Sequence, residues 1–243
     1  MARTLETFTK QQIDEVFSHP AIREVAFEIR FAARLRVNAE LWKLQDQLVE
    51  QYPNTGTESA MQPNAAILTV NVFQNALAGR VIKVSQENFV IAFTRYSRFE
   101  DFKEEVVNRT STFCATFGVK SLTRVGLRYV NEITVPVGEP PSSLLRFVRP
   151  LIDFDRIEIE SVEQFADEIR VRHKDHMVTL RGVLLPSLET RPRTYVLDID
   201  CYSPSVHAEG EVPRLLEDYH DSAQRFFLDH ITEDYKEVMR GRR

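Results

Sequence analysis

The hydrophobic and polar positions of the chain alternate with two different periods, which predicts a mixture of strands and helices. In the stretch EVAFEIRF, the apolar residues from Val25 to Phe31 occupy every second position, as in a half-buried strand. From Asn38 onward, apolar residues recur at helical spacing until Pro53, which predicts a helix capped by Asn38. An α+β fold is therefore expected.

The same two patterns continue along the rest of the chain. We expect strands at 65–73, 79–85 and 88–96, then a helix at 97–118 that Gly118 ends. From position 121 the pattern restarts, with an expected strand at 124–136, a shorter helix at 142–152, strands at 163–173, 176–186 and 194–203, and a long helix at 212–239.

The order strand, helix, three strands, helix thus occurs twice. This order predicts one domain over residues 1–243, with pseudo-repeat units at about 20–118 and 121–240. The units are expected to share a mainly antiparallel sheet with the helices on one face. No Gly/Ser-rich linker separates the two halves, which favours one domain over two.

Composition narrows the classes of partner. The chain has 243 residues and a formal net charge of −5, so no global field draws it to nucleic acid or to an anionic membrane. It has no run of the ~20 apolar residues that a membrane span needs. Its beginning is polar, and Cys114 and Cys201 stand alone. A reduced, cytoplasmic protein with no membrane partner is expected.

The stretch RVGLRYVNEITVP carries polar residues on both sides of an expected strand. Arg124 and Arg128 alternate with the apolar face that includes Leu127 and Tyr129. Asn131 falls on the apolar face, where a buried amide needs partners. The first interpretation of Asn131 is therefore structural, with its side-chain amide hydrogen-bonded to backbone groups.

The same alternation places further charges on the face of Arg128. Asp198 and Asp200 oppose an apolar face in their strand, as do Arg170 and Arg172 in theirs. If these strands share one sheet, its uncovered face carries arginines and carboxylates. They form either cross-strand ion pairs on a solvated surface or a binding surface whose arginines hold a phosphate or carboxylate.

Evidence for metal or cofactor chemistry in the sequence is weak. Asp198 and Asp200 fall on the same side of a strand, but no third ligand follows from the spacing. His173 and His176 flank a Lys-Asp turn without nearby cysteines, and His207 lies in the loop SPSVHAEGE. We expect no metal, no cofactor and no catalytic residue.

Four motifs occur in one order along the chain. They are EVAFEIRF, RVGLRYVNEI, YVLDID and, in the last helix, His220, Phe227, Ile231 and Thr232. In this combination the chain resembles a sporadically distributed family of uncharacterised prokaryotic proteins of about this length, with a central RxGLRYxN motif. The resemblance implies a bacterial or archaeal source and a patchy occurrence, sometimes with mobile or defence loci. It carries over no catalytic residue.

Three functions remain open. The first is a non-enzymatic interaction or regulatory module that holds a protein partner through the open sheet face or the C-terminal helix. Its candidate binding residues are Arg124, Arg128, Asp198 and Asp200 on the open face, together with Asn131 on the apolar face. The second is a nucleic-acid binder that uses the basic stretches RPRT, at 191–194, and RGRR, at the C-terminal end. The third is a metal-dependent hydrolase centred on the two aspartates. Homo-oligomerisation is left open.

Overall fold

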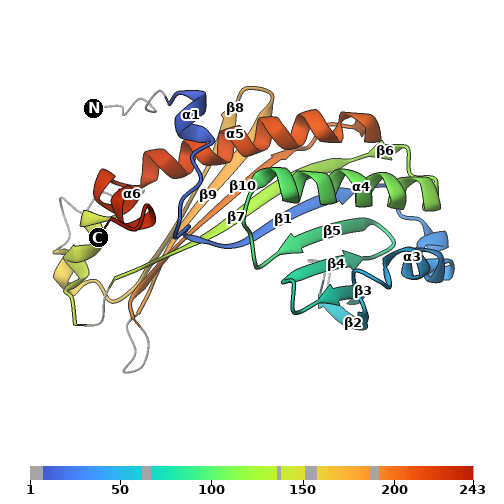
Figure 1. Ribbon diagram of the computed structural model, residues 1–243, viewed down its shortest axis with the longest axis horizontal. Coiled ribbons are helices and arrows are strands. Elements are labelled where there is room, and N and C mark those ends of the chain that lie inside the picture. Colours follow the sequence, from blue (N-terminus) through green and yellow to red (C-terminus); the bar gives the residue numbers. More distant parts are fainter. Residues whose placement is uncertain (1–7, 62–66, 136–137, 151–157, 187–191, 243) are drawn as a thin grey trace. The chain divides into compact units, whose positions relative to one another are not determined.

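The computed structural model describes residues 8–61, 67–135, 138–150, 158–186 and 192–242. Nine strands of this described part form one mainly antiparallel sheet, in the spatial order β2-β3-β4-β5-β1-β7-β10-β9-β8 (Figure 1). The predicted α+β class is confirmed. The strands of the sheet are β1 Ile22–Arg30, β2 Asn54–Met61, β3 Ile67–Asn75, β4 Arg80–Val84, β5 Asn88–Phe93, β7 Arg124–Thr134, β8 Phe165–His173, β9 His176–Leu185 and β10 Thr194–Ser203.

Helices and short elements connect these strands. The α-helices are α1 Lys10–Ile13, α2 Leu35–Ala39, α3 Leu41–Leu48, α4 Phe99–Phe117, α5 Val212–His230 and α6 Glu233–Met239. The 3-10 helices are η1 Pro141–Arg146, η2 Ile159–Ser161 and η3 Glu209–Glu211. A separate small sheet pairs β6 Ser121–Leu122 with β11 His207–Ala208.

The chain divides into two compact units. Unit 1 comprises Met1–Arg23, Arg128–Cys201 and His220–Arg243, and unit 2 comprises Glu24–Leu127 and Tyr202–Tyr219. The units do not coincide with the two halves of the sequence. The expected single domain built from two pseudo-repeat units therefore stays a prediction.

In unit 2, helix α4 supplies the aromatic part of the core. Phe113 stacks on Phe89 of β5 at 4.4 Å between ring centroids, and Phe102 meets Phe93 edge-on at 5.1 Å. These side chains are buried because the apolar stripe of α4 faces the sheet. Gly118 ends the helix in the left-handed conformation, with φ of 67°, as the sequence predicts.

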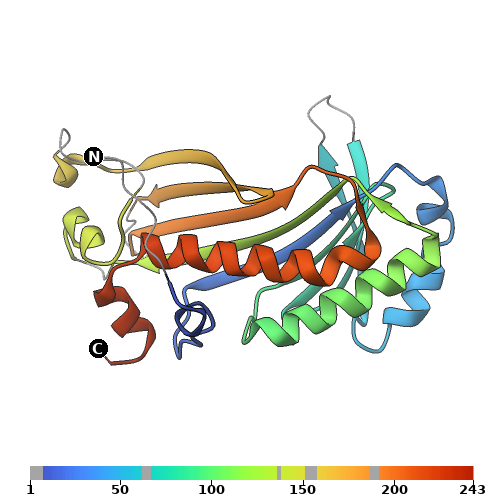
Figure 2. The same cartoon turned by 90° about the horizontal axis from the view of Figure 1, so that it is seen from above.

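In unit 1, the strands β7, β10, β9 and β8 lie side by side, with β8 at the outer edge of the sheet (Figure 2). Helix α5 covers one face of these strands. The Tyr129 hydroxyl of β7 and Nδ1 of His220 in α5 are 2.8 Å apart, and the ring of Phe226 in α5 meets the ring of His173 in β8 at 5.5 Å. The buried face predicted for the central strand is confirmed, since Tyr129 faces this helix and is only 3% exposed.

Four sequence predictions need correction. Asn38 was expected to cap one helix that runs to Pro53, but it lies inside the short helix α2, and Glu40 is the residue before α3. Strand β2 was not expected, because NTGTESAM lacks apolar alternation, yet all eight of its residues pair with β3. The long helix expected at 212–239 is two helices, because Thr232 caps α6 through the Tyr235 N–H and bonds the carbonyl of Arg146 at 2.6 Å. The helix expected at 142–152 is the shorter 3-10 helix η1, and residues 151–157 lie outside the described part.

Candidate functional site

A row of alternating charges crosses the four strands of unit 1 on the face opposite α5. Its members, which we call the charged strip, are Arg128 of β7, Asp198 of β10, Arg181 of β9, and Glu168 and Arg170 of β8. Arg128 donates to both carboxylate oxygens of Asp198, Nε to Oδ1 at 2.8 Å and Nη2 to Oδ2 at 2.9 Å. Such a bidentate pair fixes the plane of the guanidinium group as well as its position.

The strip continues outward through Arg181. Its Nη1 lies 3.7 Å from Oδ2 of Asp198, and its Nε donates to Glu168. The hydrogen bond to Glu168 raises the pKa of Arg181, so this arginine stays charged. Nη2 of Arg170 lies 3.4 Å from Oε1 of Glu168. Each carboxylate of the strip therefore lies between two guanidinium groups.

The arginines and the carboxylate at the centre of the strip differ in exposure. The side chain of Asp198 is 10% exposed, whereas those of Arg128 and Arg181 are 46% and 48% exposed. The Asp198 carboxylate therefore lies below the surface and holds guanidinium groups that reach solvent. This arrangement can present planar cationic groups in fixed positions to an anionic group of another molecule.

Apolar residues border the strip on the same face. Two positions along each strand from Arg128, Asp198 and Arg181, the side chains are Val130, Val196 and Val183, which are all half-buried. Arginine is enriched in protein–protein interfaces, and the half-buried valines offer apolar surface beside it.

Arg124 has partners other than the residues of the charged strip. Arg124 belongs to unit 2, where it donates to Glu28 of β1 and lies over the ring of Tyr202 at 4.7 Å. Its side chain is 19% exposed, and so is that of Glu28. The guanidinium group of Arg124 is thus engaged by residues of its own unit, and its role in binding stays a prediction.

Asn131 has the structural role that was its first interpretation. It is 2% exposed, and its Nδ2 donates to the carbonyl of Leu197 in β10 at 3.1 Å. Its amide therefore satisfies a buried backbone acceptor within the sheet of unit 1. It faces α5, away from the charged strip.

The two aspartates of YVLDID occupy the face that the sequence predicts, with different surroundings. Asp198 is engaged by Arg128, whereas Asp200 lies half-buried two residues further along β10. In the described residues, no group of three or more His, Cys, Asp or Glu side chains is placed to hold a metal ion. The geometry favours an ion-paired role for Asp198.

A serine, a histidine and a glutamate in unit 2 form a chain of contacts that the sequence did not predict. Nε2 of His207 is 2.8 Å from Oγ of Ser203, and Nδ1 of His207 is 3.4 Å from Oε2 of Glu211. This order resembles that of a nucleophile, base and acid. However, Ser203 is 2% exposed, and its hydroxyl accepts from the Ser205 N–H at 3.2 Å. The contacts therefore hold the loop between β10 and α5.

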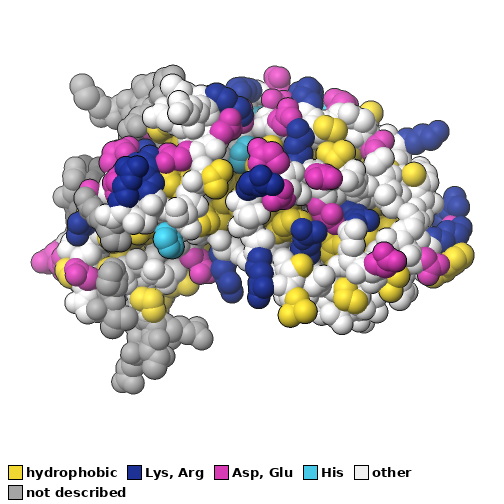
Figure 3. All heavy atoms as spheres, in the orientation of Figure 1, with side chains coloured by type: hydrophobic (Ala, Val, Ile, Leu, Met, Phe, Trp, Pro, Cys, Tyr) yellow, Lys and Arg dark blue, Asp and Glu magenta, His cyan; other side chains and the backbone are white. Residues whose placement is uncertain are grey.

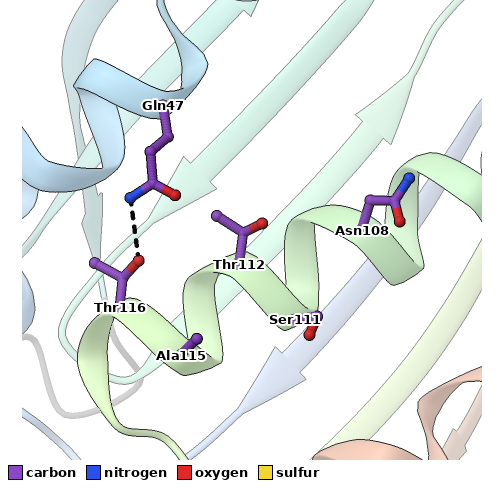
Figure 4. Close-up of a pocket in the computed structure, with 6 residues that line it drawn as sticks. All are labelled: Gln47, Asn108, Ser111, Thr112, Ala115 and Thr116. Carbon is purple, nitrogen blue, oxygen red and sulfur yellow. Dashed lines mark hydrogen bonds between the residues drawn. The ribbon is translucent and has the colours of Figure 1, made fainter.

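Helix α4 borders two polar grooves in unit 2. One, of about 560 Å³, is lined by Gln47, Asn108, Ser111, Thr112, Ala115 and Thr116, with Nε2 of Gln47 donating to Thr116 at 3.3 Å (Figure 4). It contains no titratable side chain. The other, of about 340 Å³, contains a network in which Tyr52 and Arg109 donate to Glu105 at 2.7 and 2.9 Å. Within this groove, Glu105 is therefore engaged by both Tyr52 and Arg109.

Compared with models of known protein families and with curated proteins, the chain matches none. The family resemblance drawn from the four motifs therefore stays a prediction. None of the helices in the described part of the chain is long and apolar enough to cross a membrane.

Proposed function

We propose that the protein is a non-enzymatic interaction module that binds a protein partner through the charged strip of unit 1. The observation that supports this most directly is the depth of Asp198. Its nearly buried carboxylate orients Arg128 from below, so the arginine is held in place before a partner arrives. Pre-organisation of this kind lowers the entropy lost on binding.

The chemistry of the strip supports an acidic protein surface as the partner. Three arginines and two carboxylates leave one positive charge, and the valines beside them offer apolar contact. A carboxylate of the partner can approach an arginine of the strip while aliphatic side chains of the partner cover Val130, Val196 and Val183. Arginine is among the residues that contribute most to protein interfaces.

Nucleic acid fits this surface less well. Phosphate binding relies on uncompensated positive charge, whereas Asp198 and Glu168 already neutralise much of the strip. On the face of the molecule in Figure 3, acidic and basic side chains are also interspersed. Two basic stretches could contact nucleic acid, RPRT at 191–194 and RGRR at the C-terminal end. Residue 191 of the first and residue 243 of the second lie outside the described part.

A capture experiment in the native host tests the proposal. The tagged full-length protein, Arg181→Gln and the control Arg214→Gln are used as baits, and bound protein and nucleic acid are both quantified. Arg214 is an exposed arginine of α5 outside the strip. A partner that the wild type and Arg214→Gln capture and Arg181→Gln does not supports the proposal. Equal capture by all three baits contradicts it, and specific recovery of nucleic acid favours the alternative.

A further inference from the structure

The edge strand β8 has the features of a pairing surface. It forms nine consecutive antiparallel pairs with β9, from Phe165↔Leu184 to His173↔His176, and in the described residues no strand pairs with its other side. Edge strands are usually protected by charged side chains, above all lysine, by proline or by a bulge. The sequence FADEIRVRH contains neither proline nor lysine, and its register with β9 is unbroken. It does carry charges, but Glu168 and Arg170 are of opposite sign and can attract a second strand as well as repel one.

Ile169 lies at the centre of this strand and is 42% exposed, on the face that continues the core of unit 1. The charges Glu168 and Arg170 flank it on the opposite face. From these features we infer that β8 pairs with β8 of a second copy of this chain, antiparallel and across a two-fold axis at Ile169. This inference does not depend on the proposed function.

The order of charges in β8 is self-complementary in one register. With the axis at Ile169, Glu168 lies opposite Arg170 of the second copy, and Arg170 lies opposite Glu168 of that copy, so two cross-strand ion pairs form. The two Ile169 side chains then meet on the apolar face. Moving the axis by one residue places either Glu168 or Arg170 opposite its own copy, and like charges in direct opposition are destabilising.

The backbone is compatible with this register. His173 and His176 close a two-residue turn at Lys174-Asp175, and the closing pair of such a hairpin is hydrogen-bonded. Hydrogen-bonded pairs alternate along an antiparallel ladder, which directs the backbone groups of Glu168 and Arg170 to the outer edge. The carboxylate of Asp167 is turned toward β9, where it accepts from the Gly182 N–H at 2.9 Å.

Charge exchange at β8 tests this pairing with the full-length chain. Pairing along one strand edge is a small interface, so a concentration-dependent dimer is expected, measured by sedimentation equilibrium up to the solubility limit. Glu168→Arg alone, or Arg170→Glu alone, places like charges opposite each other and should raise the dimer dissociation constant at least about tenfold. The double exchange Glu168→Arg with Arg170→Glu should restore dimerisation.

Mixing the two single variants gives the decisive result. Each supplies the charges that the other lacks, so a heterodimer should form where neither variant dimerises alone. Circular dichroism confirms that each variant is folded, and Ile169→Lys serves as a further variant expected to be monomeric. A wild type that stays monomeric at every concentration overturns the inference, and so does a dimer that neither the single exchanges nor Ile169→Lys weakens.

Discussion

The guanidinium group of Arg128 binds both carboxylate oxygens of Asp198, at 2.8 and 2.9 Å, across adjacent strands of unit 1. The carboxylate is nearly buried, and the arginine is about half exposed. The pair therefore has a structural side, which holds two strands together, and an exposed side that a partner can reach. The two sides can be separated by mutation.

Arg128→Ala should destabilise the fold, because the Asp198 carboxylate loses its bidentate partner and, among the described residues, keeps the guanidinium group of Arg181 at 3.7 Å. We expect a loss of ~1–3 kcal/mol in the free energy of unfolding. Arg170→Ala removes a more exposed contact and should cost less than about 0.5 kcal/mol. Urea unfolding of both variants checks this. Equal losses would show that the depth of Asp198 has no energetic consequence.

Leu127→Ala should cost ~2–5 kcal/mol through the cavity that it leaves, because Leu127 of β7 is fully buried. Thr134→Ala, at an exposed position of the same strand, is the matched control and should change stability little. Thermal and urea unfolding measure both. A loss below about 0.5 kcal/mol for Leu127→Ala would mean that the buried face of β7 is assigned incorrectly.

Gly182 of β9 leaves room for the hydroxyl of Tyr195, so the effects of mutations at these two positions should depend on each other. A Cβ atom at position 182 would overlap that hydroxyl and lie 2.5 Å from Oδ1 of Asp167. Gly182→Ala should therefore cost ~1–3 kcal/mol. Tyr195→Phe removes the obstructing atom and should recover part of this loss in the double variant, which a double-mutant cycle measures. Strict additivity would contradict the packing described for these residues.

The stability of the protein should fall as the pH decreases from about 6.5 to 4. Burial lowers the pKa of the His220 imidazole to about 4, and burial also lowers the pKa of His173. In this window the unfolded chain binds protons that the folded chain does not. For His220 alone, the free energy of unfolding should decrease by up to roughly 3 kcal/mol by pH 4, with little further change below it.

His220→Asn isolates this contribution, because its amide can still meet the Tyr129 hydroxyl but does not titrate. Urea unfolding between pH 7 and pH 4 should show a shallower dependence for the variant than for the wild type. The carboxylate of Glu15, whose pKa is lowered by Arg240, is common to both proteins and cancels in the comparison. Parallel curves would show that His220 titrates alike in the folded and unfolded chains.

Sequence patterns predict the elements whose two faces differ in polarity. The alternation in β7 correctly assigned Leu127 and Tyr129 to the core, and the amide of Asn131 to a backbone acceptor. Strand β2 could not be found in this way, because its pairing with β3 determines its conformation while its own residues are mostly polar and exposed.

The candidate site could be predicted only in part. The alternation of side chains along each strand places Arg128 and Asp198 on one face. It does not reveal the order of the strands in the sheet. That order brings Arg181 and Glu168 into the charged strip, whereas Arg124 contacts Glu28 and Tyr202 in unit 2. The burial of Asp198 beneath Arg128 likewise follows from neighbouring strands, which no local pattern encodes.

The most direct test of the proposed function is the affinity of the purified full-length chain for the partner recovered by capture. Isothermal titration calorimetry compares the wild type, Arg181→Gln and the control Arg214→Gln, at low and at moderate salt. If the charged strip is the binding surface, Arg181→Gln should raise the dissociation constant at least ~10-fold and reduce its salt dependence, while Arg214→Gln should match the wild type. Unchanged affinity for a folded Arg181→Gln protein would contradict the assignment of the strip as the binding surface.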